Sequence, residues 1–263
     1  MALYWRLVLA RTAGQFQYRA SLAMRTLGNF LVTFVELIAT VFLFNSFREM
    51  AGWQLGEVAF LYGLISMSLA LGELIARGFD EVSDLVRTGD FDRLLIRPVS
   101  PFLQVLAVDL DLRQFGRLAQ GALAIVLGLR WHPVAWSAVK AGAFVVALAS
   151  TTLVFCALFV IGAAACFWTV ERSEIQNAFT YGGATMLGYP IQIYRRWMRA
   201  IFLYLVPLGL TSFYPALVIL DKPDPLGLPG FVPALAPLVA AAFFAAALGL
   251  WELGLRHYQG TGS

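Results

Sequence analysis

The chain has 263 residues, of which 60% are hydrophobic and 13% are charged, and its formal net charge is +3. Ordinary soluble domains carry roughly 25% charged residues, whereas the mean hydropathy of this chain is +0.74. The composition excludes an ordinary soluble protein and predicts an all-α polytopic membrane protein. Its length suits about six spans of roughly 20 residues and leaves no room for a separate soluble catalytic domain.

The N-terminal segment, residues 1–26, contains four arginines and no acidic residue. The arginines break up its apolar patches, so the segment does not fit a signal peptide. Its spaced apolar residues predict a helix that lies on the membrane surface, and its positive charge favours the cytoplasmic side. We therefore expect an N-terminal cytoplasmic interfacial helix over residues 1–26, followed by a single transmembrane domain over residues 27–263.

Seven apolar runs follow in the predicted transmembrane domain. Five of them are expected to cross the membrane, at residues 27–47, 55–76, 118–131, 138–168 and 231–255. The third is preceded by charged residues, so its helix is expected to begin in the cytoplasm and to enter lipid near Leu118. Cys156 and Cys166 lie in the fourth run, about 15 Å apart along one helix, and are too far apart to form a disulfide.

The remaining two runs, residues 175–193 and 200–220, compete for the place of span five. If both termini are cytoplasmic, the number of spans is even and one of these runs does not cross. Residues 200–220 contain Pro207 and Pro215, so we expect them to form an outer re-entrant segment, which needs cover from protein or from a water-filled cavity. The opposite assignment would keep the arginines of the intervening YRRWMR sequence inside, as the positive-inside tendency favours, and stays open.

A charged segment, residues 77–101, separates the second and third spans. Apolar residues spaced by three or four positions predict a helix with one apolar face, and Gly89 and Pro98 predict where two short helices end. A short amphipathic element on one side of the membrane is typical of a docking site for a cytoplasmic partner; the alternative is a solvated loop. Either the apolar face of the first helix or the arginines of the second could meet the partner.

Several kinds of chemistry are excluded by missing motifs. The sequence contains no GxxxxGK[ST] nucleotide loop, no Cys/His cluster with metal spacing and no Gly-x-Ser-x-Gly motif. We therefore expect a non-catalytic chain that holds no cofactor and no metal. Its arginines are spread over many loops and do not predict a nucleic-acid surface.

Glu36 stands near the middle of the first predicted span, where a carboxylate is costly. One interpretation is an intramembrane pair with Arg113 or Arg117 of the third span, or a protonated carboxyl bonded to a neighbour. The other is a role in a translocation path. The sequence leaves both open.

A family resemblance rests on two segments. GDFDRLLIRPVSPFLQVL, residues 89–106, resembles a segment typical of ABC-2 type permeases in the branch of ABC-2 family transporter proteins, and residues 188–220 are similar to the outer segment of that branch. The resemblance implies six transmembrane helices of ABC-2 exporter type, with an N-terminal interfacial helix, a cytoplasmic coupling helix between spans 2 and 3, and an outer re-entrant segment between spans 5 and 6. By position, the coupling element is residues 77–101 and the re-entrant segment residues 200–220. The coupling residues would be Phe79, Asp80, Glu81, Val82, Asp84, Leu85, Arg87, Arg93 and Arg97.

The resemblance also implies a function. The chain would be the permease subunit of an ATP-binding cassette exporter in a bacterial or archaeal cytoplasmic membrane, with both termini cytoplasmic. Two copies of a separate ATPase subunit would bind ATP and Mg, and a second permease copy, identical or related, would complete the complex. The cargo would be amphipathic or hydrophobic. The alternatives are an ion- or proton-coupled carrier that uses Glu36 and a membrane scaffold that transports nothing.

Overall fold

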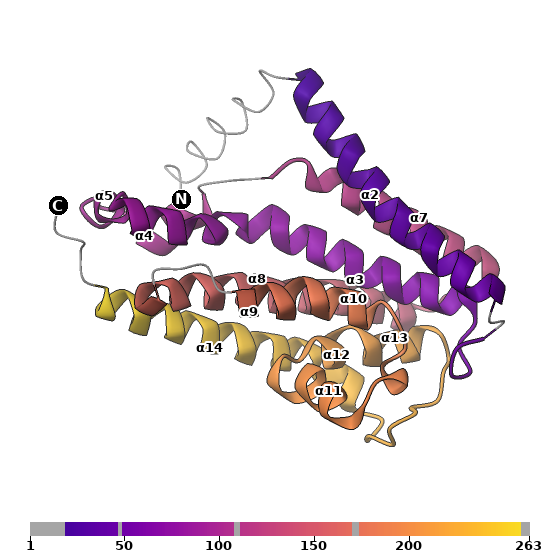
Figure 1. The fold of residues 1–263 in the computed structure, drawn as a ribbon. Coiled ribbons are helices and arrows are strands. Elements are labelled where there is room, and N and C mark those ends of the chain that lie inside the picture. The colour runs from indigo at the N-terminus through magenta and orange to yellow at the C-terminus, as the bar shows by residue number, and fades with distance from the viewer. Residues whose placement is uncertain (1–18, 47–48, 108–110, 170–173, 259–263) are drawn as a thin grey trace.

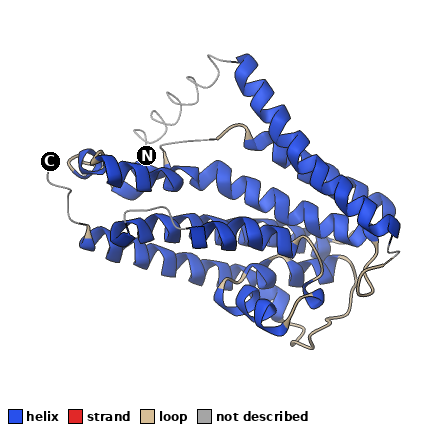
Figure 2. Cartoon of the chain, viewed as in Figure 1, coloured by secondary structure: helices blue, strands red, loops and turns tan. Residues whose placement is uncertain are grey.

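The structure is a computed structural model that describes residues 19–46, 49–107, 111–169 and 174–258. Within these ranges the regular elements are all helical (Figure 2), as the composition predicts. The long helices are α2 (Arg19–Ser46), α3 (Leu55–Ala76), α7 (Gln114–Trp131), α8 (Ala138–Thr169) and α14 (Ala236–His257). The short ones are η1 (Arg77–Glu81), α4 (Val82–Thr88), α5 (Phe91–Leu95), α6 (Pro101–Leu106), α9 (Glu174–Asn177), η2 (Ala178–Gly182), α10 (Gly183–Leu187), η3 (Ile191–Ile193), α11 (Arg196–Ala200), η4 (Ile201–Leu205), α12 (Leu208–Thr211), α13 (Phe213–Ile219) and η5 (Val232–Leu235).

The long helices form one bundle around α3 (Figure 1). Helix α3 packs against α7 on one side and α8 on the other, α14 lies along α8, and α2 lies along α7. The largest buried side chains, such as Phe60 on α3 and Phe155 and Phe159 on α8, fill the space between these helices. The apolar runs of the sequence therefore become the core of the bundle.

Close backbone contact joins α3 to α7. A Cβ atom added at Gly63 would lie 2.7 Å from the carbonyl oxygen of Gly121, and one added at Gly56 would lie 2.8 Å from that of Gly128. Both pairs are seven residues apart, so two turns of each helix meet through small residues, as is common where helices associate in membranes. Any larger side chain at these glycines would push the two helices apart.

Four helical stretches among the described residues are long and apolar enough to cross a membrane: residues 20–44, 55–88, 138–169 and 232–257. A fifth candidate is the pair Arg196–Leu205 and Leu208–Ile219, which is bent by 71° at its break. The predicted proline break in this segment is thus present. Helix α7 and the stretch from α9 to α10 do not meet these criteria, and the six-span layout stays a prediction.

Two boundaries differ from the sequence prediction. Residues 19–26, expected in a separate interfacial helix, belong to α2, because no helix-breaking residue separates them from the apolar run. Residues 1–18 of that predicted helix lie outside the described residues. The first half of the charged segment also continues α3 without a turn, so that residues 55–88 form one helical stretch of 34 residues.

The helical stretch of residues 55–88 is longer than a membrane core requires. A bilayer core about 30 Å thick takes up roughly 20 helical residues at ~1.5 Å each. Helix α3 alone meets that length, so η1 and α4 extend about 18 Å further. Helix α8, with 32 residues, also exceeds the core thickness. The bundle therefore protrudes at the end where α4 lies.

Different segments pack at the two ends of the bundle. At the end we call the coupling end, α5 packs on the last turns of α8, where the rings of Phe91 and Phe167 lie 5.1 Å apart. At the opposite end, residues 190–235 pack on the first turns of α3, where Lys222 forms an ion pair with Glu57 at 2.8 Å. Figure 1 shows α4 and α5 at one end of the long helices and α11, α12 and α13 at the other.

Candidate coupling element and intramembrane cavity

The inner face of the coupling element is fixed by an aromatic cluster. Phe79 and Phe91 are buried, and both contact Trp251 of α14, at centroid distances of 5.4 and 6.5 Å. Phe102 of α6 lies 4.9 Å from Phe79, and Phe167 of α8 lies 5.2 Å from Trp251. Aromatic side chains of this size supply much of the packing energy of a core. The cluster therefore joins the element to α8 and α14.

A hydrogen bond adds to this attachment. The Tyr258 hydroxyl, just after α14, donates to the Asp92 carboxylate of α5 over 2.9 Å. Burial and the bond to Asp92 raise the pKa of Tyr258 to about 12, so the phenol keeps its proton and remains a donor at physiological pH.

The turn between the two short helices forms as the sequence predicts. Gly89 ends α4 in the left-handed conformation, with φ of 75°, which favours glycine. Asp90 precedes α5, but its carboxylate does not cap that helix: it accepts from the Thr88 hydroxyl at 3.1 Å and pairs with Arg93 at 3.0 Å. The turn is therefore held by side chains on both sides of Gly89.

The structure corrects which predicted coupling residues can touch a partner. Phe79 and Val82 are buried inside the bundle, because the apolar face of the first short helix packs on α8 and α14. Asp80 is buried as well, next to Gln176, and Leu85 is half-buried. A contact between these side chains and another protein would require the element to leave the bundle.

The remaining predicted coupling residues lie on the outer surface. Glu81, Asp84, Arg87, Arg93 and Arg97 are exposed. Arg87 pairs with Asp84 at 2.8 Å, a surface pair of the kind that contributes little to stability.

Sequence reasoning missed two apolar residues on the same surface. Ile96 is 84% exposed and Leu95 is 41% exposed, at the end of α5. A signal was present for Ile96, which follows Phe91 by five positions and therefore lies off its buried face, whereas the four-residue spacing of Leu95 gave none. We define the exposed residues Arg87, Arg93, Leu95, Ile96 and Arg97 as the tip surface.

A buried charged network lies where the coupling element joins the membrane spans. Its centre is Glu73 of α3, which is 3% exposed. Arg117 of α7 donates to one carboxylate oxygen at 3.1 Å, and Tyr181 of η2 donates to the other at 2.6 Å. Arg77, one turn after Glu73, lies 3.5 Å from it. Glu73 therefore connects α3, η1, α7 and η2.

The network continues through Asp111. This carboxylate pairs with Arg77 at 3.4 Å and with Arg113 at 2.5 Å, and it also accepts from Gln114 at 3.0 Å. The predicted pairing of Glu36 with Arg113 or Arg117 is therefore wrong. Both arginines bind acidic residues at the coupling end, because the start of α7 lies beside the end of α3.

Glu36 instead borders a cavity of about 340 Å³ between α2, α3, α7 and residues 181–189. Its carboxylate accepts one hydrogen bond, from the Tyr62 hydroxyl at 2.9 Å, and among the described residues it forms no ion pair. The polar groups that line the cavity with it are Tyr62, Ser66, Arg117, Tyr181, Thr185 and Tyr189, and the apolar ones include Ile65 and Leu69. Glu36 is exposed in the single chain, so the cavity can be reached from the surface.

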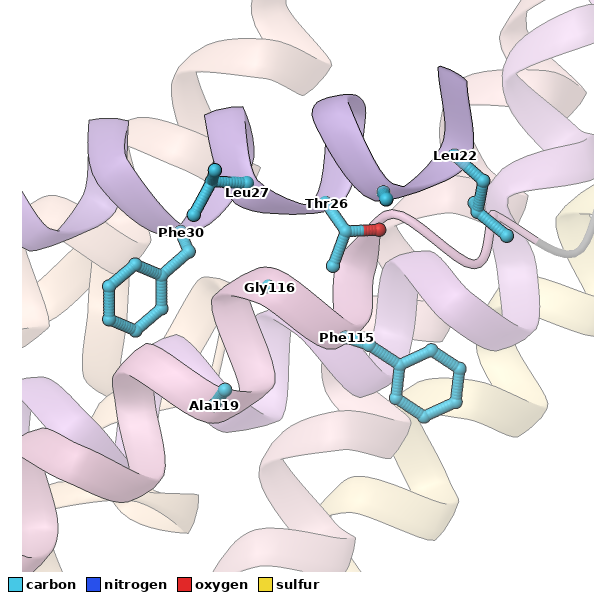
Figure 3. A pocket seen from close by; sticks show the side chains of 8 residues that line it. Leu22, Thr26, Leu27, Phe30, Phe115, Gly116 and Ala119 are labelled. Carbon is cyan, nitrogen blue, oxygen red and sulfur yellow. The ribbon is translucent and has the colours of Figure 1, made fainter. Parts of the chain in front are cut away.

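A second cavity, of about 750 Å³, lies between α2 and α7 and is almost entirely apolar (Figure 3). Leu22, Leu27 and Phe30 come from α2, and Phe115 and Ala119 come from α7. Among the described residues no charged side chain lines it, and its one polar side chain is Thr26.

These features define a class of protein: an all-helical, multi-pass membrane protein with a structured element at one end of its spans. A family model described as ABC-2 family transporter protein matches residues 30–262. The chain therefore belongs to this family and is a membrane transport component, which confirms the resemblance found in the sequence. Neither the curated proteins nor the solved structures give a match.

Proposed function

We propose that the chain is the membrane-spanning permease subunit of an ATP-binding cassette exporter, and that it moves an amphipathic or hydrophobic cargo with ATP hydrolysed by a separate ATPase subunit. The family match supports a transport role. The sequence contains no GxxxxGK[ST] nucleotide loop, which fits a permease driven by a separate ATPase subunit. The observation that carries the proposal is the coupling element, which protrudes beyond the spans and exposes apolar side chains at its tip.

The tip surface is the part of the element that meets the ATPase. Ile96 is the most exposed of the large apolar side chains of the described residues, and the charged residues Arg87, Arg93 and Arg97 are exposed on the same element. An apolar residue within a polar rim is the usual arrangement at the centre of a protein interface. Phe79 and Val82 lie inside the bundle, where they anchor the element that carries the tip surface to the spans.

Motion can pass from this surface into the membrane along two routes. The aromatic cluster joins the element to α8 and α14, and Arg77 joins it through Glu73 to α7 and η2. Because packed cores resist gradual deformation, a push on the tip would move these helices as connected bodies.

The proposed layout has six spans: α2, α3, α7, α8, the segment 174–193 and α14. The segment 174–193 starts near Asp80 at the coupling end, through Gln176, and finishes at the opposite end, where Gln192 donates to the carbonyl of Ala51. The bent pair 196–219 begins and finishes at that opposite end, since Lys222 after it donates to the carbonyl of Gly52. These contacts support an outer re-entrant segment and leave Arg195, Arg196 and Arg199 outside, against the positive-inside tendency.

The six-span layout puts both termini on one side of the membrane, and the family resemblance implies the remaining parts of the proposal. Both termini and the coupling element are cytoplasmic, and the membrane is the bacterial or archaeal cytoplasmic membrane. Two ATPase subunits, which hold ATP and Mg, and a second permease copy complete the exporter.

The test uses the purified permease–ATPase complex in nanodiscs. Ile96→Asp should lower the amount of ATPase that co-purifies with the chain by tenfold or more, because a charge replaces an apolar side chain at the centre of the tip surface. Phe231→Asp is the matched control, since Phe231 is 62% exposed at the opposite end. If both variants retain the ATPase equally, the tip surface is not the contact.

The second candidate function, an ion- or proton-coupled carrier, is favoured by one observation: Glu36 forms no ion pair among the described residues. Such a carrier would transport cargo in vesicles that contain no ATPase and no ATP, and Glu36→Gln would abolish that transport. Transport that requires ATP and the ATPase subunit excludes it.

A further inference from the structure

We propose that residues 195–205, which open the bent pair, bind an anionic phospholipid. The arginines at the start of this segment hold the lipid phosphate, and its exposed aromatic and aliphatic side chains contact the acyl chains. This contact goes beyond the exporter function, because it needs neither cargo nor an ATPase.

The segment begins at the edge of the membrane core. Gln192, just before it, donates to the backbone carbonyl of Ala51 at 3.4 Å, and Ala51 lies shortly before the first residue of α3. From this level the segment runs into the membrane, where the ring of Phe202 lies 6.2 Å from that of Phe179 in η2. Since α3 alone spans the core, the arginines at the start of the segment are level with lipid headgroups, and its end lies at the depth of the acyl chains.

Three arginines supply positive charge at headgroup level. Arg195 and Arg196 are exposed and Arg199 is half-buried, and none of the three forms an ion pair with a described residue. Arg196 and Arg199 are three positions apart in the helical stretch, so they lie on one side of it. A guanidinium group matches the geometry of a phosphate, and each arginine near an anionic bilayer surface adds to the attraction.

The described acidic residues of this end do not pair with these arginines. Asp221 and Glu57 each pair with a lysine instead. Asp224 accepts from the Tyr214 hydroxyl at 3.3 Å, and Glu49 borders a separate cavity that contains no residue of the bent pair. The phosphate of a lipid is the anion that a membrane offers at this level.

The apolar side chains of the segment favour a lipid over a soluble anion. Trp197 is 60% exposed directly after the arginines, and Tyr204 and Leu205 are 68% and 63% exposed at the other end of the same stretch. Tryptophan and tyrosine are enriched where headgroups meet acyl chains. Free phosphate or an acidic peptide would use the arginines alone, whereas a phospholipid uses the arginines and the apolar side chains together.

A lipid contact also accounts for the placement of the arginines. In the six-span layout proposed above they lie on the outer side, against the positive-inside tendency. Phosphate groups would compensate their charge there and would hold the entrance of the bent pair at the membrane surface.

The test is native mass spectrometry of the purified chain alone in detergent, titrated with phosphatidylglycerol and with phosphatidylcholine of the same acyl chains. The unmodified chain should bind the first phosphatidylglycerol molecule at least about tenfold more tightly than the first phosphatidylcholine molecule. Arg195→Gln combined with Arg196→Gln should lose most of this preference. Arg195→Lys combined with Arg196→Lys should keep a preference, because the charge remains.

Arg87→Gln combined with Arg93→Gln is the matched control. It makes the same change in net charge at two exposed arginines of the coupling end, each of which already pairs with an aspartate. This variant should keep the full preference. Unchanged binding of phosphatidylcholine to the Arg195/Arg196 glutamine variant shows that its fold is intact.

A soluble competitor distinguishes a lipid from a free phosphate. Glycerophosphoglycerol, which is the phosphatidylglycerol headgroup without acyl chains, should not displace the lipid when present in excess. The inference is overturned if it does displace the lipid, if the unmodified chain has no preference, or if the Arg195/Arg196 glutamine variant keeps the full preference. It is also overturned if the control loses as much preference as that variant. Neither cargo nor ATPase is present, so a negative result leaves the exporter assignment standing.

Discussion

Glu73 and Glu36 are two carboxylates within the spans of one bundle, and they differ in burial and in the number of their partners. Glu73 is buried and accepts bonds from Arg117 and Tyr181, with Arg77 close by. Glu36 is exposed in the single chain and accepts one bond, from Tyr62. One cavity separates them, with Arg117 and Tyr181 in one wall and Glu36 in the other.

The difference indicates two roles. A buried carboxylate with several strong donors is held in one arrangement, and loss of any member leaves a charge without compensation. A carboxylate with a single neutral donor is free to exchange that donor for a ligand. We therefore expect Glu73 to hold the coupling element to the spans and Glu36 to contribute little to the stability of the bundle.

The largest effect is expected from Glu73→Ala. Removal of this carboxylate leaves Arg77 and Arg117 without their shared partner, and breaking a buried ion pair in this way costs about 3–5 kcal/mol. Thermal unfolding in detergent, followed by tryptophan fluorescence, measures the loss. Glu81→Ala, at an exposed carboxylate of η1, is the control and should change stability by less than about 0.5 kcal/mol. Equal losses in the two variants would remove the distinction between Glu73 and a surface carboxylate.

Tyr181→Phe should have the next largest effect. It removes only the hydroxyl that donates to Glu73 at 2.6 Å, and a hydrogen bond to a charged group contributes about 1.5–3 kcal/mol. Tyr194→Phe gives a matched comparison, because no hydrogen bond of its hydroxyl occurs among the described residues. A loss as large at Tyr194 as at Tyr181 would show that the ring environment, not the bond to Glu73, sets the effect.

A double-mutant cycle tests whether Glu73 and Arg117 act as a unit. Residues in one ion-pair network show coupling energies of about 0.5–3 kcal/mol, so Glu73→Gln with Arg117→Gln should be less destabilising than the sum of the two single variants. The same unfolding assay gives all four corners of the cycle. Strict additivity would mean that the 3.1 Å contact contributes nothing beyond its two separate side chains.

Much of the bundle could be predicted from the sequence, because the signals were local. The bounds of α3 agree with the predicted run at residues 55–76, Gly89 ends α4 in the left-handed conformation, and the prolines of residues 200–220 mark a segment that is bent by 71°. Each depends on an uninterrupted apolar run, on glycine conformation or on a proline, and none depends on a distant residue.

The sites depend on contacts between distant segments, and there the sequence was less informative. The apolar face of Phe79 and Val82 was recognised, but periodicity cannot distinguish a face that binds a partner from one that packs on its own bundle. Arg117 was one of the partners considered for Glu36, yet it pairs with Glu73, 44 residues away along the chain. Arg117 and Glu73 are charged residues on largely apolar helices. Only the packing of α7 on α3 decides which charged residues of these helices come into contact.

The smallest effect on stability is expected from Glu36→Gln. The amide can still accept from Tyr62, and the side chain is exposed in the single chain, so the free energy of unfolding should change by less than about 0.5 kcal/mol. Loss of Glu73, by contrast, should lower stability strongly, because that carboxylate is buried and bonded to Arg117 and Tyr181. If Glu36→Gln destabilised the chain as strongly as Glu73→Ala, the carboxylate would belong to the structural network after all, and the assignment of the two carboxylates to different roles would fail.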